Sequence, residues 1–146
     1  MAVLNRRSLD NLRYAHPDMQ MIVSEAIKRI GFVVIRCYVG YADQEKAFRT
    51  KASPFHFPKS EHNKKPSMAI DFIPNPWNGD WNNLAPFADV AHVLIAVAEE
   101  LYAAGKIKHK FRWGHDWDMD GIEGEKGEWD TDHGELVVVK KEGNDE

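Results

Sequence analysis

Two stretches of the chain carry side chains of the kinds that bind metal ions. Residues 60–71 supply an imidazole, His62, and a carboxylate, Asp71, in the approach to a short apolar segment. Residues 129–136 supply a second imidazole, His133, just before another apolar run. A catalytic zinc site takes three ligands of these types and leaves a fourth position for water. The three residues therefore form a candidate zinc site, although spacing alone also fits a solvated surface histidine at position 62.

The length and charge of the chain narrow the classes of protein to which it can belong. With 146 residues it is long enough to bury a hydrophobic core, and we expect a single domain over residues 1–146 with a frayed tail from about residue 140. The formal charge of -4 at pH 7 gives no sign of a basic patch for nucleic acid. We therefore expect no nucleic-acid partner.

The single cysteine and the lengths of the apolar segments exclude further possibilities. Cys37 has no second cysteine with which to form an internal disulfide, and its place after the apolar run 32–35 predicts a small buried hydrophobe. The first residues lack the apolar core of a secretory signal, and no stretch approaches the roughly 20 apolar residues of a membrane span. We expect a soluble protein that is made in the cytoplasm without a signal peptide.

Hydrophobic periodicity predicts several helices and strands. Apolar residues recur at helical spacing in residues 17–30 and 87–101, and the second of these segments is apolar almost all the way round, which predicts a buried helix. A further helix is expected within residues 40–51. Short β-branched or alternating runs predict strands at 32–35, 68–73, 106–113 and 136–139. This combination predicts an α+β fold, in which a small, mainly antiparallel sheet packs with helices in one compact domain.

Several motifs spread over about residues 6–137 carry a resemblance to a known family. They are Ser60-x-His62 followed by Pro66-Ser67-x-Ala69-x-Asp71, then Asp130-x-x-His133, together with Arg7 to Leu12, His16-Pro17-Asp18, and Arg112-Trp113-Gly114-His115-Asp116-Trp117. This set resembles the M15 family of zinc peptidases, which includes D-Ala-D-Ala carboxypeptidases and bacteriophage L-alanyl-D-glutamate endolysins. The resemblance implies a hedgehog/DD-peptidase-like fold with Zn²⁺ held by His62, Asp71 and His133.

The resemblance also implies an activity. The expected reaction is zinc-dependent hydrolysis of a peptide bond in the stem peptide of bacterial peptidoglycan, by a monomeric phage lysis enzyme of the L-alanyl-D-glutamate endopeptidase type that acts on the cell wall after its release. A D,D-carboxypeptidase of the same family is one alternative. A noncatalytic, metal-stabilised wall-binding module is another, because one fold can carry different functions.

Asp130 is the residue that the resemblance implies as the catalytic carboxylate. It would take a proton from the attacking water and pass it to the leaving amine. Asp132 is a nearby competitor that spacing does not exclude, and Asp130 could instead fix the turn before the last strand. A carboxylate at Asp130 favours the enzyme over the binding module, because a purely structural zinc usually has four protein ligands and needs no base.

Four residues are candidates for contact with the substrate. M15 enzymes usually carry a substrate-binding arginine several residues before the glutamine that matches Gln44, but that place is Val39 here, and Arg36 is the available substitute. Gln44 is predicted either to contact substrate or to face solvent from its helix. Ser60 would brace a ligand or cap a turn. His115, which replaces a glycine of the family pattern, would reach the cleft or stay on the surface.

An acidic loop at residues 116–121 has part of a calcium-binding pattern. Asp116, Asp118 and Asp120 alternate and are followed by a glycine, as in the first half of an EF-hand loop. The bidentate glutamate expected at the twelfth position is Gly127, and Glu128 comes one place late. The loop therefore predicts either a Ca²⁺ site or a plain solvated acidic turn.

Overall fold

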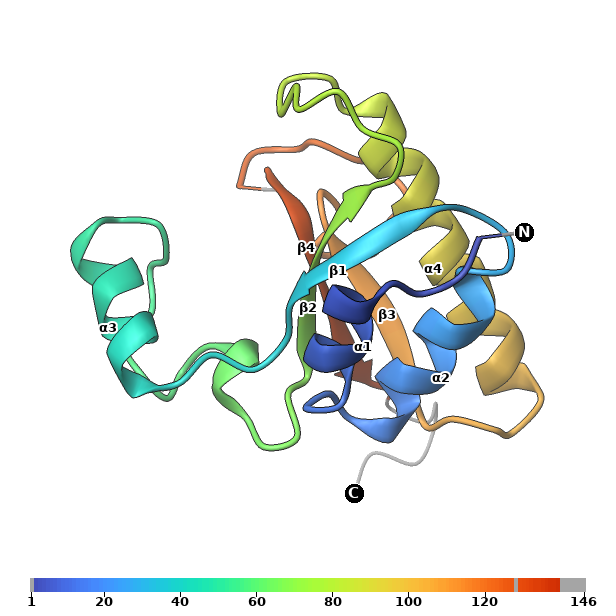
Figure 1. Ribbon diagram of the computed structural model, residues 1–146, viewed down its shortest axis with the longest axis horizontal. Coiled ribbons are helices and arrows are strands. Elements are labelled where there is room, and N and C mark those ends of the chain that lie inside the picture. Colours follow the sequence, from blue (N-terminus) through green and yellow to red (C-terminus); the bar gives the residue numbers. More distant parts are fainter. Residues whose placement is uncertain (1, 128, 140–146) are drawn as a thin grey trace.

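The computed structural model describes residues 2–127 and 129–139, which fold around a four-stranded sheet (Figure 1). The tail predicted to fray from about residue 140 lies outside these residues. In chain order, the described elements are α1 (Arg6–Leu12), α2 (Pro17–Ala26), β1 (Phe32–Arg36), α3 (Tyr41–Arg49), the 3-10 helix η1 (Glu61–Asn63), β2 (Ala69–Pro74), α4 (Ala85–Ala103), β3 (His109–Gly114) and β4 (Asp130–Val138).

The sheet has one face buried under helices. Its strand order is β1-β2-β4-β3, and every neighbouring pair of strands is antiparallel. Helix α4 packs against β2, β3 and β4, and α2 packs against α4. Phe72, Phe111 and Leu136 point from the strands into this core and are at most 2% exposed. The structure confirms the predicted α+β fold with an antiparallel sheet.

Helix α1 closes the free edge of β1. Asn5 caps α1 by accepting a hydrogen bond from the backbone N–H of Ser8. The Ser8 hydroxyl then accepts from the backbone N–H of Val34, and the Asn11 amide donates to the Val34 carbonyl. An edge strand leaves such backbone groups unpaired unless another element covers them. This seven-residue helix has no long hydrophobic period and was not predicted.

The two long helices differ from their predicted limits. Helix α2 begins at Pro17 but ends at Ala26 rather than at residue 30. Its last turn tightens, because the N–H groups of Lys28 and Arg29 donate to carbonyls three residues back. Helix α4 is longer than predicted and buries Phe87, Leu94 and four other side chains. Among the described residues, no helix is both long and apolar enough to span a bilayer.

Two strands also have limits that periodicity did not give. Strand β3 begins at His109 and not at residue 106, because the backbone N–H of Lys108 donates to the Asp18 carboxylate instead of a neighbouring strand. Strand β4 begins at Asp130, six residues before the predicted start. Asp130 pairs with Gly114 across the β3–β4 ladder, so cross-strand pairing overrides the poor strand propensity of its acidic start.

Helix α3 and the loop after it form a lobe, residues 40–59, that projects from the sheet (Figure 1). Gln44 is only 3% exposed and donates from its amide to the Ser53 hydroxyl and the Phe55 carbonyl. The Asn63 amide in turn donates to the Gln44 side-chain oxygen. These bonds tie the α3 lobe to the segment that carries His62.

Candidate metal centre and its cleft

The open face of the sheet brings together the polar side chains of three strands. Asp71 on β2 lies directly opposite His133 on β4, and Glu135 on β4 lies opposite Arg112 on β3. Side chains alternate between the faces of a strand, so these residues point away from the core to which Phe72 and Leu136 belong. The strand pairing therefore delivers an imidazole and a carboxylate, which the sequence separates by 62 positions, to one place.

His62 reaches the same place from η1. Ser60 caps this short helix with its hydroxyl, and the Asn63 side chain bonds back to the Ser60 backbone, so both ends of the turn are fixed. The backbone N–H of Val39 donates to the His62 carbonyl. The side chain of His62 is consequently held from the backbone outward.

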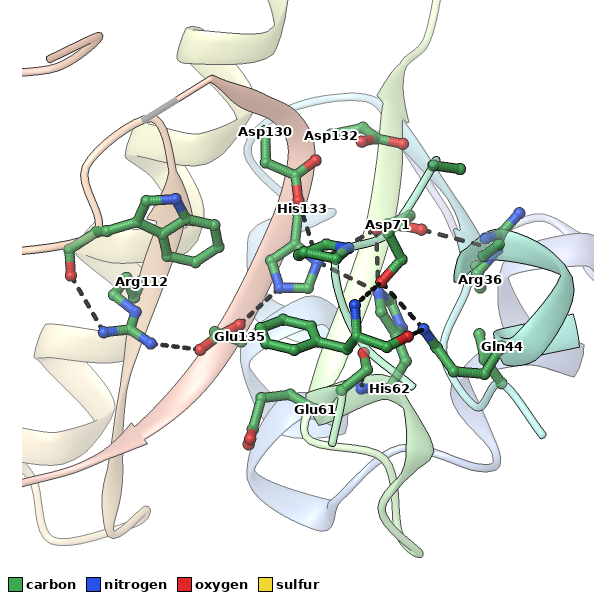
Figure 2. A pocket seen from close by; sticks show the side chains of 18 of the residues that line it. Arg36, Gln44, Glu61, His62, Asp71, Arg112, Asp130, Asp132, His133 and Glu135 are labelled. Atoms are coloured by element: carbon green, nitrogen blue, oxygen red, sulfur yellow. Dashed lines mark hydrogen bonds and ion pairs between the residues drawn. The ribbon is translucent and has the colours of Figure 1, made fainter. Parts of the chain in front are cut away.

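Three potential ligand atoms converge at this point (Figure 2). Nε2 of His62 lies 3.2 Å from Nδ1 of His133 and 3.2 Å from Oδ1 of Asp71, and the last two atoms are 3.5 Å apart. Ligands of a tetrahedral zinc ion are about 3.3 Å apart, given metal–ligand bonds of about 2.0–2.1 Å. The spacing of the three donors fits one triangular face of such a tetrahedron.

The remaining nitrogen of each imidazole is already engaged, which fixes the nitrogen available to a metal. Nδ1–H of His62 donates to the Cys37 carbonyl at 2.7 Å, and Nε2–H of His133 donates to Oε1 of Glu135 at 2.6 Å. These tautomers leave a lone pair on Nε2 of His62 and on Nδ1 of His133. Metal-binding histidines are generally oriented in this way by a carbonyl or a carboxylate. The residues present therefore fit a zinc ion.

The charges around the donors favour a cation. Burial alone would raise the pKa of Asp71, but its hydrogen bonds with His133 and His62 outweigh burial and hold that pKa far below its ordinary value. Burial alone would lower the pKa of His133, but hydrogen bonds with Asp71 and Glu135 raise it to about 10. The surroundings thus stabilise positive charge between the carboxylates. On His133 this charge is a proton on Nδ1, which a bound metal ion would displace to leave the neutral tautomer that ligation requires.

Asp130 and Asp132 line the cleft beside the three donors. Oδ2 of Asp130 lies 4.0 Å from Nδ1 of His133, and Figure 2 shows its carboxylate directed at that ring. Reduced solvation in the cleft raises the pKa of Asp130, although its side chain is still 53% exposed at the mouth. Burial and the charges of Asp71 and Asp130 raise the pKa of Asp132 to about 7. The direction of its carboxylate favours Asp130 over Asp132 as a base.

The cleft in front of these groups has a volume of about 700 Å³. The α3 lobe forms one wall with Gln44 and Phe55, and the open face of the sheet forms the other with His133 and Glu135. A cleft of this size accommodates a short peptide.

The four predicted substrate-binding residues occupy different positions. Arg36 lines the cleft with a side chain that is 57% exposed, and its Nε lies 3.7 Å from Oδ2 of Asp71. Ser60 and Gln44 also line the cleft, but Ser60 caps η1, and Gln44 is buried rather than solvent-facing.

His115 corrects a sequence expectation. It is 4% exposed, stacks on Trp113 and bonds to the Thr131 hydroxyl, and it is not among the described residues that line the cleft. The side chain is turned inward from the end of β3, so neither the cleft nor the surface position predicted for it is correct.

Sequence reasoning missed three supports of the metal centre. Glu135 and Arg112 stand behind His133, and the signal that could have found Glu135 is its place two residues after His133 on a strand, which puts both on one face. The Ser67 hydroxyl donates to the Cys37 carbonyl, which also accepts the hydrogen bond from Nδ1–H of His62. A backbone carbonyl leaves no signal in the sequence.

The acidic loop brings its three carboxylates together. Potential ligand atoms of Asp116, Asp118 and Asp120 lie within 4.8 Å of one another. Asp116 accepts hydrogen bonds from the backbone N–H groups of Asp120 and Gly121, so the loop is folded around this side chain. Glu128, the late candidate for the last ligand, lies outside the described residues.

A third group of potential ligands, His16, Asp18 and His109, lies within the same distance limit. Nδ1 of His16 accepts the backbone N–H of Asp18 as the cap of α2, which leaves the proton on Nε2. Nδ1 of His109 donates to Asp18, which also accepts the N–H of Lys108. The hydrogen bonds that Asp18 accepts from Lys108 and His109 join α2 to β3.

Comparison with known proteins relates this chain to a family of peptidases and to a solved structure. A family model described as phage L-alanyl-D-glutamate peptidase matches residues 2–137. The crystal structure of the Serratia marcescens L-Ala D-Glu endopeptidase ChiX superimposes with a TM-score of 0.68 at 23% sequence identity, covering 90% of this chain and 87% of that one. At this identity, the likeness shows a shared fold. No curated protein matches the sequence.

Proposed function

This chain belongs to the phage L-alanyl-D-glutamate peptidase family and is a peptidoglycan peptidase, and we propose that it is a monomeric zinc enzyme that cuts the amide bond between L-alanine and D-glutamate in the stem peptide. His62, Asp71 and His133 would hold the zinc ion, and Asp130 would serve as the catalytic carboxylate. The related ChiX structure is itself described as an L-Ala D-Glu endopeptidase.

The observation that carries the proposal is the convergence of three donor atoms at 3.2–3.5 Å on the floor of a cleft. Each donor is a neutral imidazole nitrogen or a carboxylate oxygen, as zinc requires. Asp130 and the cleft lie beside these donors, so a fourth ligand would come from that side. Three protein ligands with one open position are typical of catalytic zinc, whereas structural zinc is usually enclosed by four.

The side chains of the cleft would have different roles in hydrolysis. When bound, zinc would act as a Lewis acid that polarises the scissile carbonyl and makes a water molecule more acidic. Asp130 would accept the proton of the attacking water and then donate it to the departing nitrogen of D-glutamate. Arg36, exposed beside Asp71, would bind a carboxylate of the substrate. Gln44 and Ser60 would support the wall and the floor of the cleft.

Digestion of purified peptidoglycan tests the reaction. Zinc-loaded protein should release fragments with new amine termini on D-glutamate. Release of free D-alanine would show a D,D-carboxypeptidase instead, and binding to the wall without new amine termini would show a binding module.

Variants test the assignment of residues. His62→Ala, Asp71→Ala and His133→Ala should each reduce the bound zinc measured by elemental analysis, while Asp130→Ala should keep zinc and lose turnover. Full activity of the Asp130 variant would place the base elsewhere.

We propose, in addition, that the acidic loop binds calcium through Asp116, Asp118 and Asp120. Three carboxylates that converge within 4.8 Å supply the oxygen ligands that Ca²⁺ prefers. Burial raises the pKa of Asp116, and the neighbouring carboxylates Asp118 and Asp120 contribute to this rise, so a cation would relieve the crowding of negative charge. Isothermal titration with CaCl₂ should show binding to the wild type and weaker binding to Asp118→Asn. If the wild type shows no binding, the loop is a plain acidic turn.

A further inference from the structure

Glu135 connects the metal centre to a residue outside it. Its two carboxylate oxygens have different partners, since Oε1 accepts from Nε2–H of His133 at 2.6 Å and Oε2 accepts from Nη2 of Arg112 at 2.5 Å. The side chain is 8% exposed. A buried carboxylate with one oxygen on an imidazole and the other on a guanidinium has little freedom to rotate.

Arg112 is anchored on its other side by the start of the acidic loop. Its Nη1 donates to the Trp117 carbonyl at 3.1 Å, and its guanidinium carbon lies 5.1 Å from the centre of the Trp117 ring. The Trp117 ring in turn lies 5.5 Å from the ring of His133. Arg112 thus contacts Trp117 on one side and Glu135 on the other, and Figure 2 shows Arg112, Glu135 and His133 joined in this order.

Stability alone is a poor reason for this arrangement. Nε of Arg112 is buried and makes no hydrogen bond with the described residues. A buried polar atom without a partner costs free energy, and loss of hydration of the buried Glu135 carboxylate offsets much of its attraction to Arg112, whose side chain is 30% exposed. A role at the neighbouring metal ligand accounts for the pair.

We infer that Glu135 and Arg112 are positioning residues that fix the His133 ring and its tautomer, so that Nδ1 presents its lone pair to the metal. The inference rests on the proposed zinc site and adds two residues to it. A neutral imidazole carries one N–H, and the Glu135 carboxylate can only accept, which assigns that proton to Nε2. Arg112 keeps the carboxylate turned toward His133 by holding its second oxygen.

Zinc affinity measures this role without reference to hydrolysis. Loss of a second-layer partner of a metal-binding histidine typically weakens metal binding about 10- to 100-fold. In competition with a chromophoric chelator, Glu135→Ala should weaken zinc binding by about this factor. Glu135→Gln should lose less, because its amide oxygen still accepts from Nε2–H. Arg112→Met should also bind zinc more weakly than the wild type.

Lys110→Met is the matched control. Lys110 lies two residues before Arg112 on β3 and pairs with Glu99 of α4 at 3.2 Å, away from His133. Removal of this cation should leave zinc affinity unchanged. The visible spectrum of the cobalt-substituted protein should change in Glu135→Ala and Arg112→Met and remain that of the wild type in Lys110→Met, which separates a change of ligand geometry from a general loss of stability.

The inference would be overturned if the two single variants, Glu135→Gln and Arg112→Met, were both folded and both bound zinc as tightly as the wild type. If Glu135→Ala fails to fold, these two single variants decide the question. These results are distinct from failure of the proposed function, in which the wild-type protein would bind zinc but release no amine termini, or would bind no zinc at all.

Discussion

Gly114 offers a sharp test of whether Asp130 is the catalytic carboxylate, because it controls where Asp130 sits. A Cβ atom at position 114 would lie 2.1 Å from the Asp130 carbonyl oxygen and 2.7 Å from the Asp130 Cβ. Ordinary contact begins at 3.4 Å, so Gly114→Ala requires the start of β4 to move by about 1.3 Å. The carbonyl oxygen and the Cβ of Asp130 are fixed by the backbone, so neither can rotate away.

The size of the effect follows from this displacement. Forcing a methyl group into a packed region costs about 1–3 kcal/mol of unfolding free energy. Misplacement of a catalytic group by about 1 Å lowers the rate about 100-fold. His133 is held by its pairing with Asp71 on β2, so zinc binding should survive. We therefore expect Gly114→Ala to fold, to bind zinc and to lose most of its kcat.

The assay compares this variant with Gly40→Ala. A Cβ at position 40 would meet its nearest atom at 3.6 Å, which is an ordinary contact. Urea unfolding, zinc content and release of amine termini from peptidoglycan should be measured for both proteins. If folded, zinc-loaded Gly114→Ala retained wild-type kcat, Asp130 would not be the catalytic carboxylate, or the β3–β4 contact would not hold it in place.

Three further outcomes are expected. Asp130→Asn should keep stoichiometric zinc while kcat falls about 100- to 10,000-fold, and a smaller fall would transfer the base role to another group. Burial would raise the pKa of Asp18, but hydrogen bonds from His109 and the backbone lower it overall, so the ionised carboxylate stabilises the fold above its unfolded pKa of 3.8 and stabilises it less as pH falls below that value. Asp18→Asn should therefore lower the free energy of unfolding in urea by about 1–3 kcal/mol at pH 7 and by less at pH 3. An equal loss at both pH values would refute this linkage. Calcium added to the protein should alter tryptophan fluorescence, because Trp117 lies within the acidic loop, and a flat titration would count against the proposed calcium site.

The elements that sequence reasoning located best are those with a long hydrophobic period. Helix α4 and the centre of α2 carry enough apolar residues for a period to be read, and the core buries them. Helix α1 has seven residues and exists because Asn5 caps it and β1 needs its edge covered. That cause is tertiary, and no local pattern contains it.

In the candidate site, likewise, some residues could be predicted from sequence motifs and others depend on tertiary contacts. His62, Asp71, Asp130 and His133 were found because several motifs together resemble a family, and the structure brings all four to one cleft. The acidic start of β4 hid the fact that Asp130 belongs to a strand. The roles of Glu135, Arg112 and the Cys37 carbonyl depend on register and on backbone atoms, which a linear pattern does not reveal.

The register that sets Asp71 opposite His133 has a consequence for changes of chain length. Successive residues of a strand face opposite sides, so inserting one residue into β4 before His133 would turn that imidazole into the core and Gly134 outward, or would shift the whole ladder. The segment from Ile122 to Gly127, in contrast, is exposed and belongs to no strand. We expect natural and engineered length variation to accumulate in that segment and to be excluded from the strand that follows it.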